Sequence, residues 1–258
     1  MTRFKLTVEY VGTRYRGWQI QKNARTVAGE LHQAVRTVAG RDPGEVYGSG
    51  RTDAGVHALH QVAHLDLEMH LSPAQLLWRL NEELPADINL LALEPAAPRF
   101  HARHAAVARS YLYQIACRRT ALGKPLVWWI KDALDVPAMA RAGRLFEGLH
   151  DFQSFTDRDP EDGSTKVKVT SVEVIEEGAL VLIRIVGSHF LWKMVRRMVG
   201  VLAEVGRGDY DEDDVRALLR APSEAPARLT APPSGLFLER VLYEGDPALA
   251  PIRAVLPL

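Results

Sequence analysis

Two hydrophobic periods alternate along the first hundred residues. Apolar side chains recur at every second position in residues 4–10, a pattern typical of a strand with one buried face, and residues 56–67 are expected to form a long strand. Between these runs, residues 27–38 carry apolar side chains at helical spacing. A second helix is expected over 72–84, which open on a serine and a glutamine at capping-box spacing, and 88–93 return to a strand.

The second part of the chain is expected to repeat this mixture. Residues 111–116 alternate as a strand, and 137–146 have the spacing of a helix. A hairpin is predicted over 171–186, because two strand-like runs flank a Glu-Gly pair. The longest amphipathic helix is expected over 191–205, and 236–243 form a last strand.

These elements predict an α+β fold class. We expect two similar mixed α/β halves, residues 1–104 and 105–258, with antiparallel sheets joined into a central sheet, helices on the outside and a cleft between the halves. Residues 118–135 show no clear periodicity and are expected to form a long loop or crossover. Residues 221–234 carry four prolines and are expected to form a surface connection.

The composition is that of an ordinary globular protein. Of 258 residues, 47% are hydrophobic and 25% are charged, and no apolar run approaches the length of a membrane span. The N-terminus shows no secretory pattern. The single cysteine, Cys117, cannot form an internal disulfide or a cysteine-based zinc site, and its place in an alternating run predicts a packed strand residue. We therefore expect a cytoplasmic protein with no membrane partner.

The charges balance in sum but are segregated along the chain. The 32 basic and 32 acidic residues give a net charge of zero, which taken alone argues weakly against a nucleic-acid partner. Segregation, however, allows a positive groove on a neutral protein. Three basic clusters stand out, namely Arg14, Arg16, Lys22 and Arg25; Arg99, His101, Arg103, His104 and Arg109; and Lys193, Arg196 and Arg197. The acidic residues gather in 157–162, 173–177 and 209–214.

Residues 48–55, Gly-Ser-Gly-Arg-Thr-Asp-Ala-Gly, predict a loop with special backbone torsions, because glycine weakens both helix and strand. Something must come very close to this loop. In one interpretation Asp53 is an ionised carboxylate, kept charged by Arg51, which also grips a phosphate or carbonyl. In the other, Asp53 caps its own backbone in an Asx turn before Gly55. A nucleotide-phosphate cradle is disfavoured, because no Gly-Lys-Ser/Thr ending follows and the next residues have strand periodicity.

The string at 48–58 resembles the signature of the TruA family of tRNA pseudouridine synthases, in which the aspartate is the catalytic carboxylate. Each shorter block of family sequence is a weak signal alone, whereas eight blocks in the family's order are a strong one. The other seven blocks lie at 10–21, 81–88, 100–103, 109–113, 150–155, 190–200 and 231–238.

The resemblance implies the isomerisation of uridine to pseudouridine in the anticodon stem-loop of tRNA, at tRNA positions 38 to 40. Such an enzyme breaks the bond between the ribose and N1 of the base and rejoins them through C5. No atom is transferred from outside, so no cofactor, nucleotide or metal is expected. The resemblance also implies a homodimer, with one tRNA bridging both subunits.

The family's functional residues fall on five positions of this chain. Asp53 matches the catalytic carboxylate, and the resemblance offers Arg51 and Arg196 as the guanidinium groups that keep it anionic. Tyr111 matches the tyrosine that stacks on the target uracil, and Leu236 matches an apolar residue on the other side of the base. Tyr113 would face the same side of its strand as Tyr111, so the residues alone leave both tyrosines open, and ordinary core packing is the alternative for each.

Two rival functions belong to other classes. A metal hydrolase is suggested by the histidines at 57, 60, 64, 101 and 104, but His57 and His60 would point to opposite faces of a strand and no zincin-type glutamate accompanies them. A catalytically inactive tRNA-binding or chaperone protein is the second rival. Such a protein would most readily have lost Asp53 or Tyr111, and both are present.

Overall fold

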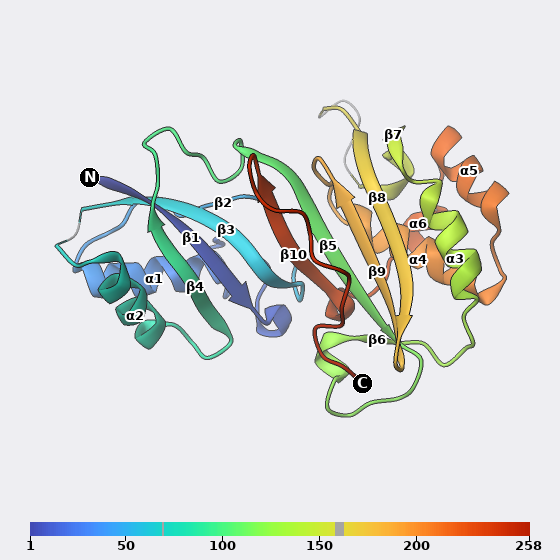
Figure 1. Ribbon diagram of the computed structural model, residues 1–258, viewed down its shortest axis with the longest axis horizontal. Helices are drawn as coiled ribbons and strands as arrows, with labels where there is room; N and C mark the ends of the chain where they lie inside the picture. The colour runs from blue at the N-terminus through green and yellow to red at the C-terminus, as the bar shows by residue number, and fades with distance from the viewer. Residues whose placement is uncertain (69, 158–162) are drawn as a thin grey trace. The chain divides into compact units, whose positions relative to one another are not determined.

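The computed structural model describes residues 1–68, 70–157 and 163–258 and shows a mixed α/β protein with mostly antiparallel strand pairing (Figure 1). The acidic run predicted at 157–162 lies, apart from Asp157, outside the described residues. The chain divides into two compact units. The first unit comprises Met1–Val107 and Leu238–Asp246, and the second unit comprises Ala108–Phe237 and Pro247–Leu258.

The first unit contains a sheet with the strand order β4-β1-β3-β10, in which β1 pairs antiparallel with both neighbours. In β1, buried residues alternate with partly exposed ones as the sequence predicts, and Leu6 lies opposite Ala63 of β3. The bounds are β1 Thr2–Tyr10, β2 Tyr47–Gly48, β3 His57–Leu67, β4 Ile88–Pro95 and β10 Leu236–Tyr243. The two-residue strand β2 pairs antiparallel with β3.

The first unit also has two helices, α1 (Val27–Ala39) and α2 (Pro73–Glu83). Helix α1 begins where the side chain of Thr26 accepts a hydrogen bond from the Gly29 N–H, and it ends at Gly40, whose φ is 65°. At the start of α2, both hydrogen bonds of the capping box between Ser72 and Gln75 are present. The two helices predicted from the sequence are confirmed.

The second unit contains an antiparallel sheet with the order β5-β9-β8-β7, and the short strand β6 pairs in parallel with β5. The predicted hairpin is confirmed as β8 and β9, whose turn includes Gly178 with φ 60°. The bounds are β5 Ala106–Ala116, β6 Trp128–Trp129, β7 Gly148–Asp151, β8 Lys166–Glu177 and β9 Leu180–Gly187.

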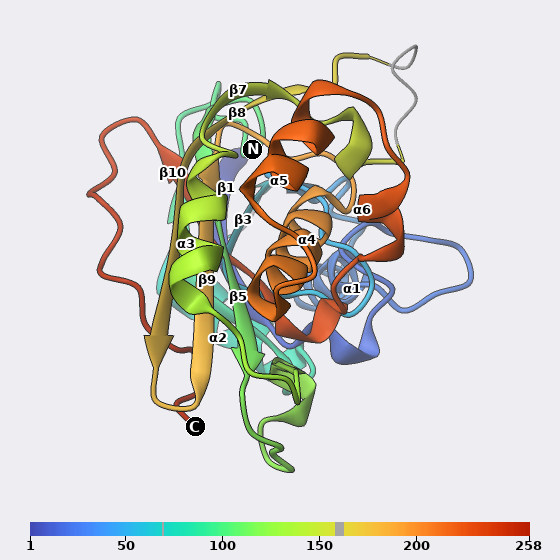
Figure 2. The same cartoon turned by 90° about the vertical axis from the view of Figure 1, so that its right-hand side faces the viewer.

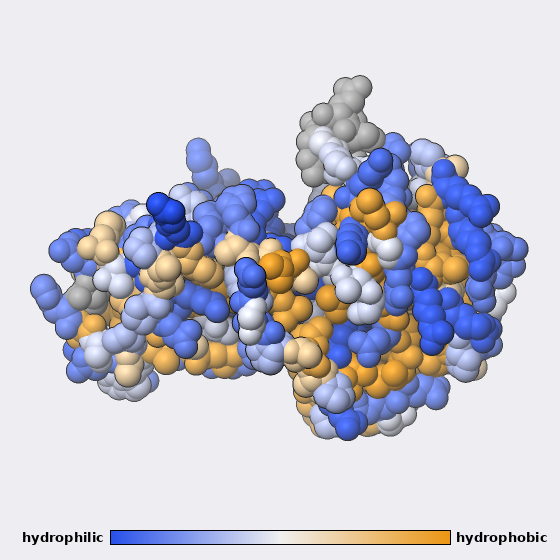
Figure 3. Space-filling model, turned by 45° about the horizontal axis from the view of Figure 1, so that its top comes forward, coloured by the Kyte–Doolittle hydropathy of each residue, from blue (hydrophilic) through white to orange (hydrophobic). Residues whose placement is uncertain are grey.

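Among its described residues, the second unit has the α-helices α3 (Val136–Arg144), α4 (Met194–Arg207), α5 (Glu212–Arg220) and α6 (Ala225–Arg228). Figure 2 shows α4, α5 and α6 on one face of this unit's sheet. On the other face, Ile252 and the residues after it pack around Leu112 of β5. Successive strand residues point to opposite faces, so Tyr111 and Tyr113 point toward the helices. In Figure 3, apolar residues gather over the right-hand part of the face shown.

Three sequence expectations need correction or refinement. Helix α5 was not anticipated, because the acids at 209–214 suggested only a charged surface; Asp211 in fact caps this helix and forms a capping box with Asp214. Residues 221–234 are more than a surface connection, because they contain α6 and the buried Ala231. Cys117 is not a packed strand residue: it lies one position beyond β5 and is exposed.

The segment 118–135 is a loop that contains short ordered pieces, a 3-10 helix at Lys124–Leu126 and the strand β6. The long amphipathic helix is confirmed as α4, although it begins at Met194 and includes Gly206, and Gly208 with φ 83° caps its end. No helix within the described ranges is long and apolar enough to cross a membrane.

Candidate active site

Residues 49–56 connect β2 to β3 and form the predicted loop. The Val56 N–H donates to the main-chain carbonyl of Asp53 at 3.1 Å and closes a four-residue turn. Gly55, the third residue of this turn, has φ 80°, a conformation that favours glycine. Arg51 is exposed and Asp53 is partly buried, so this tight turn presents the carboxylate side chain at its first position.

Another segment of the same chain, residues 12–18, packs closely against this loop. The Trp18 N–H donates to the Thr52 carbonyl at 3.1 Å, and the Gly55 N–H donates to the Tyr15 carbonyl at 3.2 Å. A Cβ on Gly17 would lie 2.4 Å from the Thr52 oxygen, and one on Gly12 would lie 1.9 Å from the Val56 oxygen. Main chain therefore packs directly on main chain, and glycine is required on the supporting side.

Side chains beneath the loop fix it further. The hydroxyl groups of Tyr10 and Thr52 share a buried hydrogen bond of 2.8 Å. Gln61 of β3 accepts from the Ser49 hydroxyl at 2.7 Å and donates to the Gly50 carbonyl at 3.1 Å. Sequence reasoning did not assign a positioning role to Thr52, Ser49 or Gln61, because each contact joins positions that only the fold brings together.

The first predicted basic cluster begins on the segment that supports the loop, which contains Arg14 and Arg16, and continues just beyond it with Lys22 and Arg25. Arg14, Arg16 and Lys22 are exposed, and none of them forms an ion pair with any residue that the structure describes. Arg25 differs, because it pairs with Glu30 at 2.6 Å and its guanidinium lies 5.0 Å from the centre of the Tyr15 ring. Uncompensated positive charge therefore lies on the segment that contacts the Asp53 loop.

The second unit carries the predicted tyrosine on β5. Tyr111 is partly buried, and its ring meets Phe190 edge-on at 5.1 Å between ring centres. Tyr113 is fully buried, and its hydroxyl donates to the Pro232 carbonyl at 2.8 Å. Burial raises the pKa of Tyr113 well above its usual range. Tyr113 thus has a packing role, which favours Tyr111 as the tyrosine that can meet a substrate.

Arg196 and the 231–236 segment are joined within the second unit. The Arg196 Nε donates to the Ala231 carbonyl at 2.7 Å, and the Ala231 N–H donates to the Arg196 carbonyl at 3.0 Å. Arg196 also lies close enough to Tyr113 to oppose the rise in that residue's pKa. Leu236, at the start of β10, is 4% exposed, so the 231–236 segment ends in the hydrophobic core.

The third basic cluster is largely neutralised, contrary to expectation. Arg197 is 3% exposed and forms an ion pair with Asp157, and the Lys193 amine lies 2.8 Å from the same carboxylate. These two cations lower the pKa of Asp157 below its usual range, with the hydrogen bond from Lys193 as the largest cause.

Two histidines of the rival metal-hydrolase interpretation accept hydrogen bonds from main-chain N–H groups. The Nδ1 of His57 accepts from the Gly12 N–H at 3.0 Å, and the Nδ1 of His64 accepts from the Ala102 N–H at 3.2 Å. His57 is buried and His60 is exposed, and the pairing of β1 with β3 has a register shift between them, so strict alternation does not apply to this pair. Burial, helped by the nearby His101, lowers the pKa of His64 to about 4. No three histidine, cysteine or acidic side chains of the described chain are grouped to hold a metal ion.

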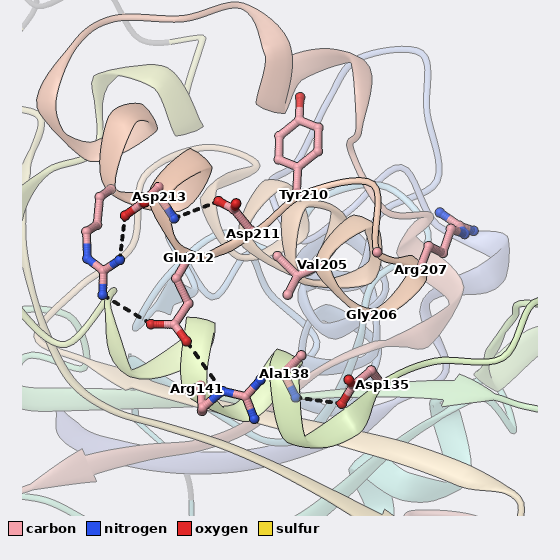
Figure 4. A pocket seen from close by; sticks show the side chains of 12 residues that line it. Asp135, Ala138, Arg141, Val205, Gly206, Arg207, Tyr210, Asp211, Glu212 and Asp213 are labelled. Atoms are coloured by element: carbon pink, nitrogen blue, oxygen red, sulfur yellow. Dashed lines mark hydrogen bonds and ion pairs between the residues drawn. The ribbon is translucent and has the colours of Figure 1, made fainter.

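A pocket in the second unit is separate from these residues. It is lined by α3, the end of α4 and the start of α5 (Figure 4). Its arginines are balanced by acids: Glu212 pairs with both Arg141 and Arg216, at 3.3 and 3.1 Å. None of the five residues predicted for the site lines this pocket.

Residues 6–104 and 142–244, which include the Asp53 loop, Arg196 and Leu236, match the sequence model of the tRNA pseudouridine synthase family. The chain belongs to this family of RNA-modifying isomerases.

Its curated relatives narrow the assignment. This chain is 42% identical to a Nitrobacter winogradskyi protein named tRNA pseudouridine synthase A, in an alignment that covers 95% of this chain and 97% of that protein. Proteins of the same name from Rhodopseudomonas palustris and Agrobacterium fabrum are 40% and 39% identical, with 95% and 94% of this chain covered and 100% and 93% of theirs. A solved complex of Cbf5, Nop10 and Gar1 resembles the chain only weakly, with a TM-score of 0.34 and 13% identity over 77% of this chain and 54% of that chain.

Proposed function

We propose that this protein converts uridine to pseudouridine in the anticodon stem-loop of tRNA, with Asp53 as the catalytic carboxylate. The observation that carries the proposal is the fixed geometry of the Asp53 loop on the 12–18 segment. The loop and its support are far apart in sequence, yet both fall on blocks of the family pattern. The backbone that carries this carboxylate is fixed by main-chain contacts with another segment. The carboxylate therefore has the small positional freedom that a reaction at one atom requires.

The reaction balances without an outside atom. The bond between C1′ of the ribose and N1 of the base breaks, the base turns, and a bond forms between C1′ and C5. The proton lost from C5 is matched by the proton that N1 gains. The protein must therefore supply a carboxylate at the reacting sugar or base, exclude water, and hold the detached base.

Each remaining site residue receives one of these tasks. Tyr111 and Leu236 hold the uracil between an aromatic ring and an apolar side chain, and the partial burial of Tyr111 beside Phe190 supports its role. Arg196 contributes the positive charge that keeps Asp53 ionised. Arg51, exposed in the same loop, contacts the phosphate of the extruded nucleotide or fills the space that the extruded base leaves.

The partners follow from the substrate. The uncompensated Arg14, Arg16 and Lys22 favour an RNA backbone beside the Asp53 loop. A tRNA substrate places the activity in the cytoplasm. We also expect a homodimer with one tRNA across both subunits, as the family resemblance implies, and light scattering coupled to size exclusion would measure the mass in solution.

The decisive experiment replaces Asp53. We expect Asp53→Asn, which keeps the shape of the side chain, to lower the rate of pseudouridine formation by roughly 1000-fold or more, because no carboxylate remains to react. Binding of tRNA should stay within a few-fold of wild type. Glu94→Gln removes an exposed carboxylate from the same unit and should leave the rate unchanged. Wild-type activity in the Asp53→Asn protein would refute the assignment, and an inactive wild type would favour the tRNA-chaperone alternative.

A further inference from the structure

Residues 118–131, here called the basic segment, follow strand β5 and take no part in the proposed active site. The segment also lies outside the two stretches that match the family model. It contains no aspartate or glutamate and four exposed basic residues, Arg118, Arg119, Lys124 and Lys131. Among them stands Trp129, which is 45% exposed, with the Arg119 guanidinium 6.0 Å from its ring centre.

The four cations of the basic segment are uncompensated. Within the described part of the chain, none of them forms an ion pair. Asp132, the acid that follows the segment, pairs with Arg207 of α4 at 3.0 Å instead. Arginines elsewhere in the second unit, such as Arg141 and Arg216, do have carboxylate partners. An unneutralised group of cations fits an anionic partner.

The second unit holds the basic segment in a defined conformation. Strand β6, close to the end of the segment, pairs with the end of β5. The Gln114 side chain donates to the Leu126 carbonyl at 3.1 Å, and the Ser234 hydroxyl donates to the Val127 carbonyl at 3.1 Å. Leu256 and Leu258 pack against Gly123. Cations on a fixed scaffold lose less conformational freedom on binding than cations on a mobile loop.

The segment is remote from the base-binding tyrosine of the same unit. Figures 1 and 2 both show the loop that contains β6 extending beyond the end of β5. Tyr111 lies five residues before Ala116, the last residue of β5, which corresponds to about 17 Å along an extended strand. A ligand group that reaches the basic segment is therefore a different part of the RNA from the uridine at Tyr111.

We propose that the basic segment is a second RNA-contacting surface, which binds backbone phosphates of tRNA outside the anticodon stem-loop. The proposal rests on the proposed function, which supplies the RNA. Arg118, Arg119, Lys124 and Lys131 contact phosphates, and the exposed face of Trp129 offers a flat surface for a ribose or an unpaired base. This surface adds affinity for whole tRNA and leaves the chemical step unchanged.

The test compares two RNAs and two variants. In the first variant, all four cations of the basic segment are changed to glutamine. We expect its Kd for full-length tRNA to rise roughly tenfold, and the slope of log K against log salt to become shallower by roughly 3, since each lost phosphate contact removes about 0.7 to 0.9. Its affinity for a short anticodon stem-loop RNA should stay within twofold of wild type.

The matched control removes the same charge elsewhere in the second unit. Arg141, Arg216, Arg228 and Arg253, each within ion-pair distance of a carboxylate, are changed to glutamine. This variant should keep both the wild-type affinity and the wild-type salt slope. Unchanged tRNA affinity in the first variant, or an equal loss on both RNAs, would overturn the second surface. Activity of that variant on the stem-loop RNA reports the proposed function separately, because the two can fail independently.

Discussion

The Asp53 loop of the first unit and the Tyr111 region of the second unit are held by different physical means. The loop rests on residues 12–18 through main-chain hydrogen bonds and glycine contacts with no room for a methyl group. In the second unit, the contacts are made by side chains: the Tyr111 ring meets the Phe190 ring, the Tyr113 hydroxyl donates to the Pro232 carbonyl, and the Arg196 guanidinium donates to the Ala231 carbonyl. The proposed catalytic carboxylate is thus positioned by backbone shape, whereas the predicted base-binding residues are positioned by packing.

This difference bears on how each region tolerates change. A packed side chain can be trimmed or repacked at a cost of about 1 to 3 kcal/mol, and the surrounding structure relaxes in part. Main chain against main chain cannot relax without moving the loop itself. We therefore expect the replacement of Gly12 or Gly17, on which the loop packs, to cost more stability than the trimming of a packed side chain in the second unit.

The largest effect is expected for Gly17→Ala. The new Cβ would lie 2.4 Å from the Thr52 oxygen, and the φ of 91° disfavours any side chain, so we expect a loss of about 3 to 4 kcal/mol in the free energy of unfolding. Activity should fall even where the protein remains folded. Gly40→Ala is the matched control, because Gly40 has φ 65° with nothing within 4 Å and should cost only about 1 kcal/mol. Equal costs in urea unfolding would contradict the role of close packing.

Smaller effects are expected for the two tyrosines of β5, on activity for Tyr111 and on stability for Tyr113. Tyr111→Leu should lower kcat/KM for tRNA by roughly 100-fold, about 2.7 kcal/mol, with little change in stability. Tyr113→Phe removes the buried hydrogen bond to Pro232 and should cost about 1 to 2 kcal/mol in unfolding free energy with little change in kcat. Steady-state kinetics and thermal unfolding of both proteins would measure the two effects. The opposite pattern would make Tyr113 the base-binding residue.

The smallest effect concerns acid sensitivity of the first unit. His64 pairs in register with Tyr47 of β2, just before the Asp53 loop, and its pKa is about 4 in the folded protein against an ordinary 6.5. Between these values the unfolded chain binds a proton that the folded chain does not, so stability falls as the pH falls.

From pH 7 to pH 5 this linkage should remove about 2 kcal/mol of unfolding free energy. His64→Gln should remove that dependence, whereas His60→Gln, at an exposed position of the same strand, should keep it. Urea unfolding at both pH values measures the difference. An unchanged pH dependence in His64→Gln would show that another group is responsible.

Strong periodicity carried most of the fold prediction. Helices α1, α2 and α4 and the long strands follow apolar spacings that only one secondary structure satisfies, and the α2 capping box is local in sequence. Helix α5 was missed because its acidic first turn resembles a solvated run, although Asp211 and Asp214 are spaced as a cap. The exposed Cys117 shows the usual error at an element boundary.

The site was predictable in part for a related reason. Glycine spacing marked the loop around Asp53, because glycine has few other reasons to recur there. The Tyr10 to Thr52 hydrogen bond and the support from Gln61 could not be predicted, since each joins residues that are distant or ambiguous in sequence. Nor does the strand predicted at 236–243 indicate which other strand it will pair with.

Strand β10 has a consequence for synthesis on the ribosome. Residues Leu238–Asp246 belong to the first unit, whose other members end at Val107, so about 130 residues of the second unit are translated between them. The first unit therefore lacks an integral strand until nearly the whole polypeptide has emerged. A nascent chain arrested after residue 107 should leave uncovered the part of β3 that pairs with β10, which makes it a candidate for chaperone binding until translation is complete.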